Sequence, residues 1–213
     1  MVKFIYQNFP SQEVVRLKRI FNMNTLYISA AIIAVSAFML PRVIEAVNLH
    51  IHGISYIAEQ TEEYFKITEP IEGEYSVELD LSDPESNEGQ ILFDDGDNTI
   101  SVLEVVPRDE AGYEVIFRSH ASERADGAAL ISGVEHDYTD EGFTHSFKAE
   151  AVASIDGGEP FELSPTGSTG LSYQDGDQFG FILDASSADA VSAKVTVTNL
   201  QLNLWAEMWW PQS

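Results

Sequence analysis

The stretch TLYISAAIIAVSAFMLPRVIEAV, residues 25–47, is the most apolar part of the chain. Its residues 25–41 belong to a run of 22 residues, 20–41, that contains no formally charged side chain. A helix of that length spans about 33 Å, close to the roughly 30 Å hydrocarbon core of a bilayer. The run therefore predicts a membrane-spanning helix, with a buried helix of a soluble domain as the alternative. A cleaved secretory signal fits less well, because no A-x-A site follows.

Charge is distributed unevenly around this run. The chain carries −24 overall, and three basic residues, Arg16, Lys18 and Arg19, stand just before the span. Residues 43–213 hold 6 basic and 34 acidic residues, about −28. The positive-inside rule then predicts a cytoplasmic N-terminus and an extracytoplasmic C-terminal domain, at the cell surface or envelope. So acidic a surface repels phosphate backbones, which excludes nucleic acid as a partner.

The span continues into an amphipathic pattern. Apolar residues recur at alternating steps of four and three, the spacing of a heptad-like seam on a helix. The seam consists of Leu40, Ile44, Val47, Ile51 and Ile54 and continues through Ala58, Thr61 and Phe65. This spacing predicts one helix over residues 20–66, kinked at Pro41 and weakened at Gly53. The seam packs either on the chain's own domain or against identical helices.

A basic N-terminal segment, an apolar helix kinked by proline, an amphipathic half and a β-rich domain together resemble a type IV pilin. With Ile20 as the first mature residue, Pro41 stands where pilins commonly place their helix-kinking proline. Arg19 and Asn24 stand where pilins usually carry glycine and glutamate, so residues 1–19 are either a basic N-terminal segment or a leader. The resemblance covers residues 16–65 and implies a filament subunit that assembles with copies of itself.

The remainder, residues 67–213, has the pattern of an acidic β domain. Short alternating segments, such as YSVELDL, TISVLEVV, YEVIFRS and QFGFILDA, are separated by breakers such as SDPESNEG, SGVEHDYTDEG and SPTGSTG. Many short strands with regular turns predict a mostly β fold, an antiparallel β-sandwich or jelly roll. The whole chain is then a long N-terminal helix followed by this domain.

The last predicted strand, AKVTVTNLQLNLW, changes phase. Val195 and Val197 share one face, whereas Leu200, Leu202 and Leu204 have the opposite parity. A bulge near Thr198-Asn199 would keep both sets pointing inward. The alternative is that the strand leaves its own sheet after the bulge and pairs elsewhere.

Two kinds of ligand contact are suggested by residue type. Hard cations bind oxygen-rich loops. Calcium is thus the cofactor expected at Asp94, Asp95 and Asp97 in DDGDN and at Asp175 and Asp177 in DGD, although ordinary turns use the same residues. Near the C-terminus, Trp205, Trp209 and Trp210 either cap the core or form an aromatic contact with glycans, a subunit or the membrane.

The sequence contains no nucleophile elbow, phosphate loop, zinc-protease or dinucleotide motif, and it has no cysteine. We therefore expect a protein that is not an enzyme. The preferred function is a structural subunit of a surface assembly, such as a pilus-like filament or a virion or envelope layer, held in the membrane by residues 20–41. The alternative is a membrane-tethered, lectin-like module that binds carbohydrate.

Overall fold

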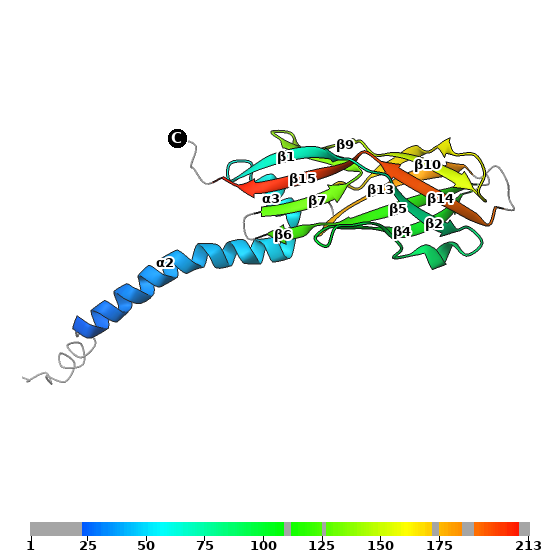
Figure 1. Cartoon of the computed structure of the whole chain (residues 1–213). Coiled ribbons are helices and arrows are strands. Elements are labelled where there is room, and N and C mark those ends of the chain that lie inside the picture. The colour runs from blue at the N-terminus through cyan, green and yellow to red at the C-terminus, as the bar shows by residue number, and fades with distance from the viewer. Residues whose placement is uncertain (1–22, 109–111, 125–126, 172–174, 185–189, 209–213) are drawn as a thin grey trace, which may run out of the picture. The chain divides into compact units, whose positions relative to one another are not determined.

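The computed structural model describes residues 23–108, 112–124, 127–171, 175–184 and 190–208 (Figure 1). The chain divides into two compact units between Val47 and Asn48. The first unit is helical, and the second, residues 48–213, is called the head. The head is built mostly of antiparallel strands, so the prediction of a mostly β fold behind an apolar N-terminal helix is confirmed.

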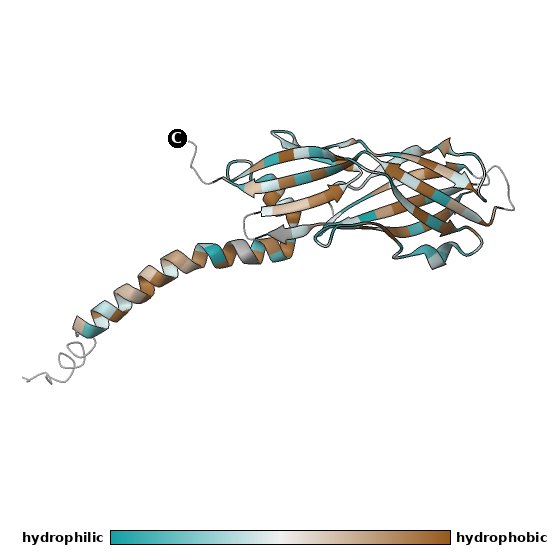
Figure 2. Ribbon diagram, viewed as in Figure 1, coloured by the Kyte–Doolittle hydropathy of each residue, from teal (hydrophilic) through white to brown (hydrophobic). Residues whose placement is uncertain are grey.

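The described part of the N-terminal unit belongs to the helix α2, Met23–His52, which contains Pro41 and whose last five residues, 48–52, belong to the head. Hydrophobic residues dominate its sequence over most of its length (Figure 2). Large apolar side chains are exposed all around it, from Met23 to Val47. A helix that is apolar all round needs a hydrophobic environment on every side. Among the described helices, α2 alone is long and apolar enough to cross a membrane.

The predicted continuous helix to residue 66 is wrong, because the helix stops at Gly53. Gly53 has φ 64°, a left-handed conformation that favours glycine, and its N–H donates to the carbonyl of Leu49 at 2.7 Å. A second short helix, α3, Ile54–Glu59, follows at once and buries Ile54, Ile57 and Ala58. Strand β1 then begins at Tyr64, so Phe65 belongs to a strand rather than to the helical seam.

The head contains fifteen described strands in four sheets. Their bounds are β1 Tyr64–Ile71, β2 Tyr75–Asp80, β3 Ile91–Asp94, β4 Thr99–Arg108, β5 Gly112–His120, β6 Ser122–Arg124, β7 Gly127–Ser132, β8 Val134–Thr139, β9 Gly142–Phe147, β10 Glu150–Ile155, β11 Phe161–Glu162, β12 Ser164–Ser168, β13 Gly176–Asp184, β14 Ser192–Thr198 and β15 Leu200–Glu207, with a short 3₁₀ helix at Pro84–Asn87. The sheet orders are β1-β15-β7-β6, β11-β10-β14-β2, β12-β13-β5-β4-β3 and the hairpin β8-β9.

The main core gathers side chains from both the β11-β10-β14-β2 sheet and the β12-β13-β5-β4-β3 sheet. At its centre Phe117, Phe179 and Phe181 are fully buried, and the rings of Phe117 and Phe179 stack at 5.5 Å between centroids. Alternation explains this burial, since every second residue of β13 and β5 points to the same side of the sheet. A second, smaller core joins α3 to β7 and β15 through Ile54, Leu130 and Trp205.

The phase change in the last predicted strand is a switch between sheets. β14 pairs with β10 and β2, whereas β15 pairs with β1 and β7. Asn199 makes the turn between them with φ 56°, and its Nδ2 donates to the carbonyl of Lys148 at 2.7 Å. The alternative in which the strand leaves its sheet is therefore confirmed.

The switch also changes which side chains of β15 are most buried. Leu200 is fully buried as expected, but Leu202 and Leu204 are only partly buried. Asn203 and Trp205, on the opposite face, are buried instead. Leu202 still packs against the main core, so the expectation that all three leucines point into the core was wrong only for Leu204.

Two segments that were predicted to be breakers between strands contain strands themselves. SGVEHDYTDEG holds β8, and SPTGSTG holds β12. β8 alternates buried Val134 and His136 with more exposed polar residues, so its inward face carries a histidine instead of a second aliphatic side chain. Polar composition thus hid a period-2 pattern that is present in the sequence.

Candidate functional site

The predicted assembly seam is divided by Gly53 into an exposed part and a buried part. Leu40, Ile44 and Val47 are exposed, and Ile51 is 59% exposed. Ile54 is 0% exposed and packs in the second core with Trp205 and Leu130. The last seam position therefore stabilises the head itself, while the four positions on α2 are exposed among the residues that the structure describes.

The apolar helix is longer than the hydrocarbon core of a bilayer. A 30-residue helix is about 45 Å long, roughly 15 Å more than the hydrocarbon core. Arg42 is the first charged residue after the span, and its guanidinium lies over the ring of Phe38 at 5.2 Å. If Arg42 marks the membrane boundary, then Ile44, Val47 and Ile51 lie outside the lipid. These side chains need a protein partner to leave water.

The DDGDN loop is organised as a tight turn. Asp94 Oδ1 accepts the N–H of Gly96 at 2.8 Å, and Asp95 Oδ1 accepts the N–H groups of Asp97 and Asn98 at 2.9 and 2.7 Å. Partial burial raises the pKa of Asp95, but these hydrogen bonds outweigh it and hold the pKa below its ordinary value. The carboxylates thus serve the backbone of the turn, the alternative role expected of such residues.

The DGD pair separates into one surface and one interior carboxylate. Asp175 is half-exposed, and its two oxygens accept from Arg118 Nη2 at 2.6 Å and pair with His120 Nδ1 at 2.7 Å. Burial raises its pKa, but the hydrogen bonds of His120 and Arg118 and their charge hold the pKa below the ordinary value. Between the two acids, Gly176 lies so close to β5 that a Cβ there would clash with the carbonyl oxygen of Ser119.

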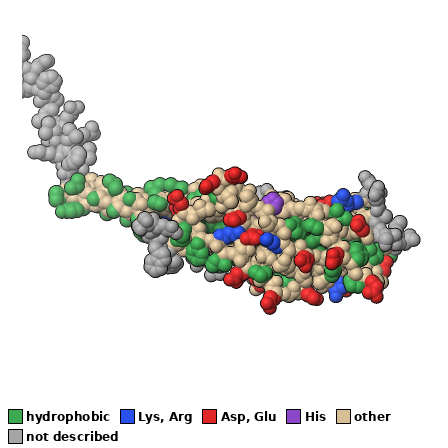
Figure 3. Space-filling view, turned by 90° about the horizontal axis from the view of Figure 1, so that it is seen from above, with side chains coloured by type: hydrophobic (Ala, Val, Ile, Leu, Met, Phe, Trp, Pro, Cys, Tyr) green, Lys and Arg blue, Asp and Glu red, His purple; other side chains and the backbone are tan. Residues whose placement is uncertain are grey.

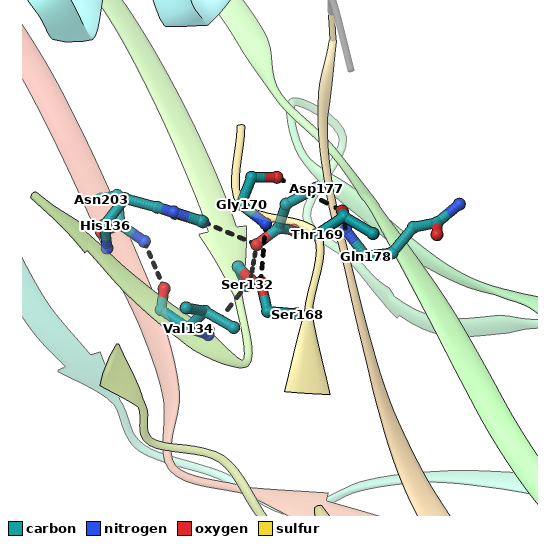
Figure 4. Close-up of polar contacts among 9 residues, drawn as sticks. All are labelled: Ser132, Val134, His136, Ser168, Thr169, Gly170, Asp177, Gln178 and Asn203. Atoms are coloured by element: carbon teal, nitrogen blue, oxygen red, sulfur yellow. Dashed lines mark hydrogen bonds and ion pairs between the residues drawn. The ribbon is translucent and has the colours of Figure 1, made fainter. Parts of the chain in front are cut away.

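Asp177 is buried in a polar cluster between strands, which Figure 4 shows. Its Oδ2 accepts from Ser132 Oγ at 2.6 Å and pairs with His136 Nε2 at 2.6 Å. The backbone of β8 is held from the other side by Asn203, whose Oδ1 accepts from the N–H of His136 and whose Nδ2 donates to the carbonyl of Val134, both at 2.9 Å. The cluster therefore ties together β7, β8, β13 and β15.

The residue types of this cluster, Ser132, His136 and Asp177, are those of a hydrolytic triad, but their connections differ. In a triad the histidine bonds to the serine and removes its proton. Here both the serine and the histidine bond to the same carboxylate oxygen, so the histidine is not placed to take the proton of Ser132 Oγ. All three side chains are also buried. This geometry serves to hold strands together rather than to activate a nucleophile.

The calcium prediction stays untested. Within the described ranges, the structure brings no three His, Asp or Glu side chains into an arrangement that could hold a metal ion. It places Asp94, Asp95 and Asp97 in an exposed turn, Asp175 in a surface ion pair and Asp177 in the interior. Of the aromatic candidates, Trp205 lies in the second core. Trp209 and Trp210 lie outside the described residues.

The head surface is strongly acidic. Acidic side chains outnumber basic ones on the face seen in Figure 3. Four basic side chains, Lys66, Arg108, Arg118 and Lys148, already lie within 4.0 Å of a carboxylate. These basic residues are already counted in the net charge of about −28, so the folded head repels itself.

We expect added salt to stabilise the head, because ions screen this repulsion. The melting temperature, followed by circular dichroism, should rise between low and high sodium chloride. Calcium at matched ionic strength should raise it further if any of the Asp-rich loops binds the ion. A melting temperature that does not change with salt would contradict the electrostatic argument. An equal response to both salts would contradict the calcium site.

The chain was compared with models of protein families, with curated proteins and with solved structures, and none of the three comparisons gave a match.

Proposed function

We propose that this chain is a structural subunit of a surface assembly, a pilus-like filament or a membrane-anchored envelope or virion layer. The observation that carries the proposal is the exposure of apolar side chains along α2 from Met23 to Val47. Burying each large apolar side chain stabilises by about 1.5–3 kcal/mol. Even with partial burial already counted, leaving this helix in water would cost on the order of 10 kcal/mol or more. A membrane and neighbouring subunits are the environments that remove this cost.

The rest of the chain fits a subunit displayed outside the membrane. The head has its own core, which an antiparallel β-sandwich or jelly roll would form between its two larger sheets. Its acidic surface keeps it soluble and away from anionic headgroups. The pilin-like order of basic segment, proline-kinked helix and β head supports a filament, with the helices as the contact between copies. Asp-rich turns at the head surface are where calcium would bind if it joins acidic neighbours.

Electron microscopy of the protein in its native membranes tests this proposal. We expect regular filaments or a continuous layer that contains the chain. Separate particles, each anchored on its own, would contradict assembly. That result would favour the tethered binding module instead.

Fewer observations support the alternative function, a membrane-tethered lectin-like module, than support a structural subunit. A hollow of about 240 Å³ over β5, β12 and β13 is lined by polar groups of Glu114, Thr166, Ser168 and Gln178. It is smaller than the roughly 300–1,000 Å³ of usual ligand pockets. Sugar-binding sites commonly use an exposed aromatic platform, and the aromatic ring that lines this hollow, Phe179, is buried. The hollow therefore adds little weight to carbohydrate binding.

Topology provides a separate test. With the N-terminus in the cytoplasm and the head outside, protease added to intact cells should digest the head and spare an N-terminal tag. The reason is the asymmetry between Arg16, Lys18 and Arg19 on one side of the span and the acidic residues on the other. Immunoblotting against tags at the two ends measures this. Protection of both tags in intact cells, with digestion after permeabilisation, would contradict the proposed topology.

A further inference from the structure

One face of the sheet β1-β15-β7-β6 is packed against other parts of the head, and the opposite face is partly exposed. Strand pairing places Trp205 beside Ala128 and Lys66 beside Trp205, so these residues share one face. α3 packs on this face through Ile54 and Ile57. Lys66 also lies within 4.0 Å of Glu135 and Asp137 of β8. This face is therefore covered by the head itself.

The opposite face carries an apolar patch. Phe65 is opposite Ala206, and Ile67 is opposite Leu204, so these four residues share the face away from α3. We call them the β1–β15 patch. Phe65 is 42% exposed and Ile67 is 39% exposed, while Leu204 and Ala206 are partly buried. Ala129 of β7, opposite Leu204, lies on the same face but is buried, so the exposed part of the face is limited to β1 and β15. An apolar face of a sheet is usually covered by a helix or a second sheet.

We propose that the β1–β15 patch binds the exposed helical segment 43–51 of a second copy of this chain. This inference rests on the proposed assembly and names the surfaces that meet in it. Each copy has this patch, and each has the apolar helical stripe of Ile44, Val47 and Ile51, which lies outside the lipid if Arg42 marks the membrane boundary. Both surfaces are apolar, and a helix that packs on a sheet buries the apolar side chains of both.

Charge makes helical segment 43–51 a more favourable partner for the β1–β15 patch than a second head. Two heads near −28 repel each other, whereas segment 43–51 has Glu45 as its one formal charge and follows Arg42 directly. The patch is also suitably placed along the chain. β1 begins at Tyr64, twelve residues after α2 ends at His52, and it contacts α3. The patch and the exposed seam are therefore close to each other in the sequence.

The absence of cysteine from the chain allows a direct test. Two differently tagged full-length chains, one carrying Ile44→Cys and the other Ile67→Cys, are co-expressed and oxidised in native membranes. We expect a disulfide-linked dimer that contains both tags. Val152→Cys is the matched control, because Val152 is 38% exposed and lies in a different sheet, on β10. It should not cross-link to Ile44→Cys. Repeating the pairing with Val47→Cys, on the next turn, covers a one-turn difference in register.

The other possible results separate a failure of the patch from a failure of the proposed function. Cross-linking of Ile44→Cys only to itself, in assembled material, would overturn the patch and indicate a helix–helix contact. The proposed function would survive that result. Absence of any cross-link in assembled material would overturn the patch as well. Absence of assembly by electron microscopy would remove the proposed function and this inference together. As a second readout, Ile67→Glu should reduce assembly at least tenfold, while Val152→Glu should leave it unchanged.

Discussion

Ile51→Glu is expected to abolish assembly while the head remains folded. Ile51 is 59% exposed in the single chain, so the glutamate is solvated there and the free energy of unfolding of the head should hardly change. In an assembly the same side chain is covered by a neighbour. A charge at that position costs several kcal/mol at each subunit contact, and the cost recurs at every contact along a filament or layer.

Ile54→Glu is the informative contrast, because Ile54 is the next seam position and is fully buried inside the head. A buried, unpaired charge there should destabilise the head by more than about 4 kcal/mol. His52→Glu, at an exposed position at the end of α2 and off the seam, controls for the added charge and should assemble normally. Melting curves of the detergent-extracted chain measure folding, and electron microscopy measures assembly. Normal assembly of Ile51→Glu would remove the filament proposal.

Asp177→Ala is expected to cause a large loss of stability in the head. The change removes the oxygen that accepts from Ser132 and pairs with His136, and it leaves both of these groups buried without that partner. Breaking a buried pair in this way costs about 3–5 kcal/mol. For a domain of this size that corresponds to a fall in melting temperature of roughly 6–20 °C.

Asp175→Ala is the matched control, two residues earlier, in the turn that precedes β13. Asp175 is half-exposed, and exposed ion pairs contribute about 1 kcal/mol or less. Urea denaturation of the two variants should therefore separate them by at least 2 kcal/mol. The double variant with His136→Ala should cost less than the sum of the single changes, because the two residues share one interaction. Equal losses for Asp175→Ala and Asp177→Ala would contradict a special role for the buried cluster.

The helical and β parts of the chain could be predicted from the sequence because their signals are local. An uncharged run of 22 residues, 20–41, indicates an apolar helix whatever it packs against. Alternation in segments such as YEVIFRS and QFGFILDA predicted β5 and β13, since period 2 is a property of a strand by itself. The Asp-rich stretches were likewise recognisable as turns or cation loops. These features depend on neighbours in the sequence.

What the tertiary structure alone decided depends on residues far apart in the chain. The seam is periodic through Gly53, yet only packing against Trp205 and Leu130 makes Ile54 a core residue and leaves Ile51 exposed. His136 and Asp177 were both visible as titratable residues, but their pairing joins β8 to β13 across 41 positions, and no spacing rule relates them. β8 can bury a polar face because Asp177 and Asn203 form hydrogen bonds with His136 and with the carbonyl of Val134. Periodicity in the sequence determines which elements form, whereas the partners that cover each face exist only after the strands have paired.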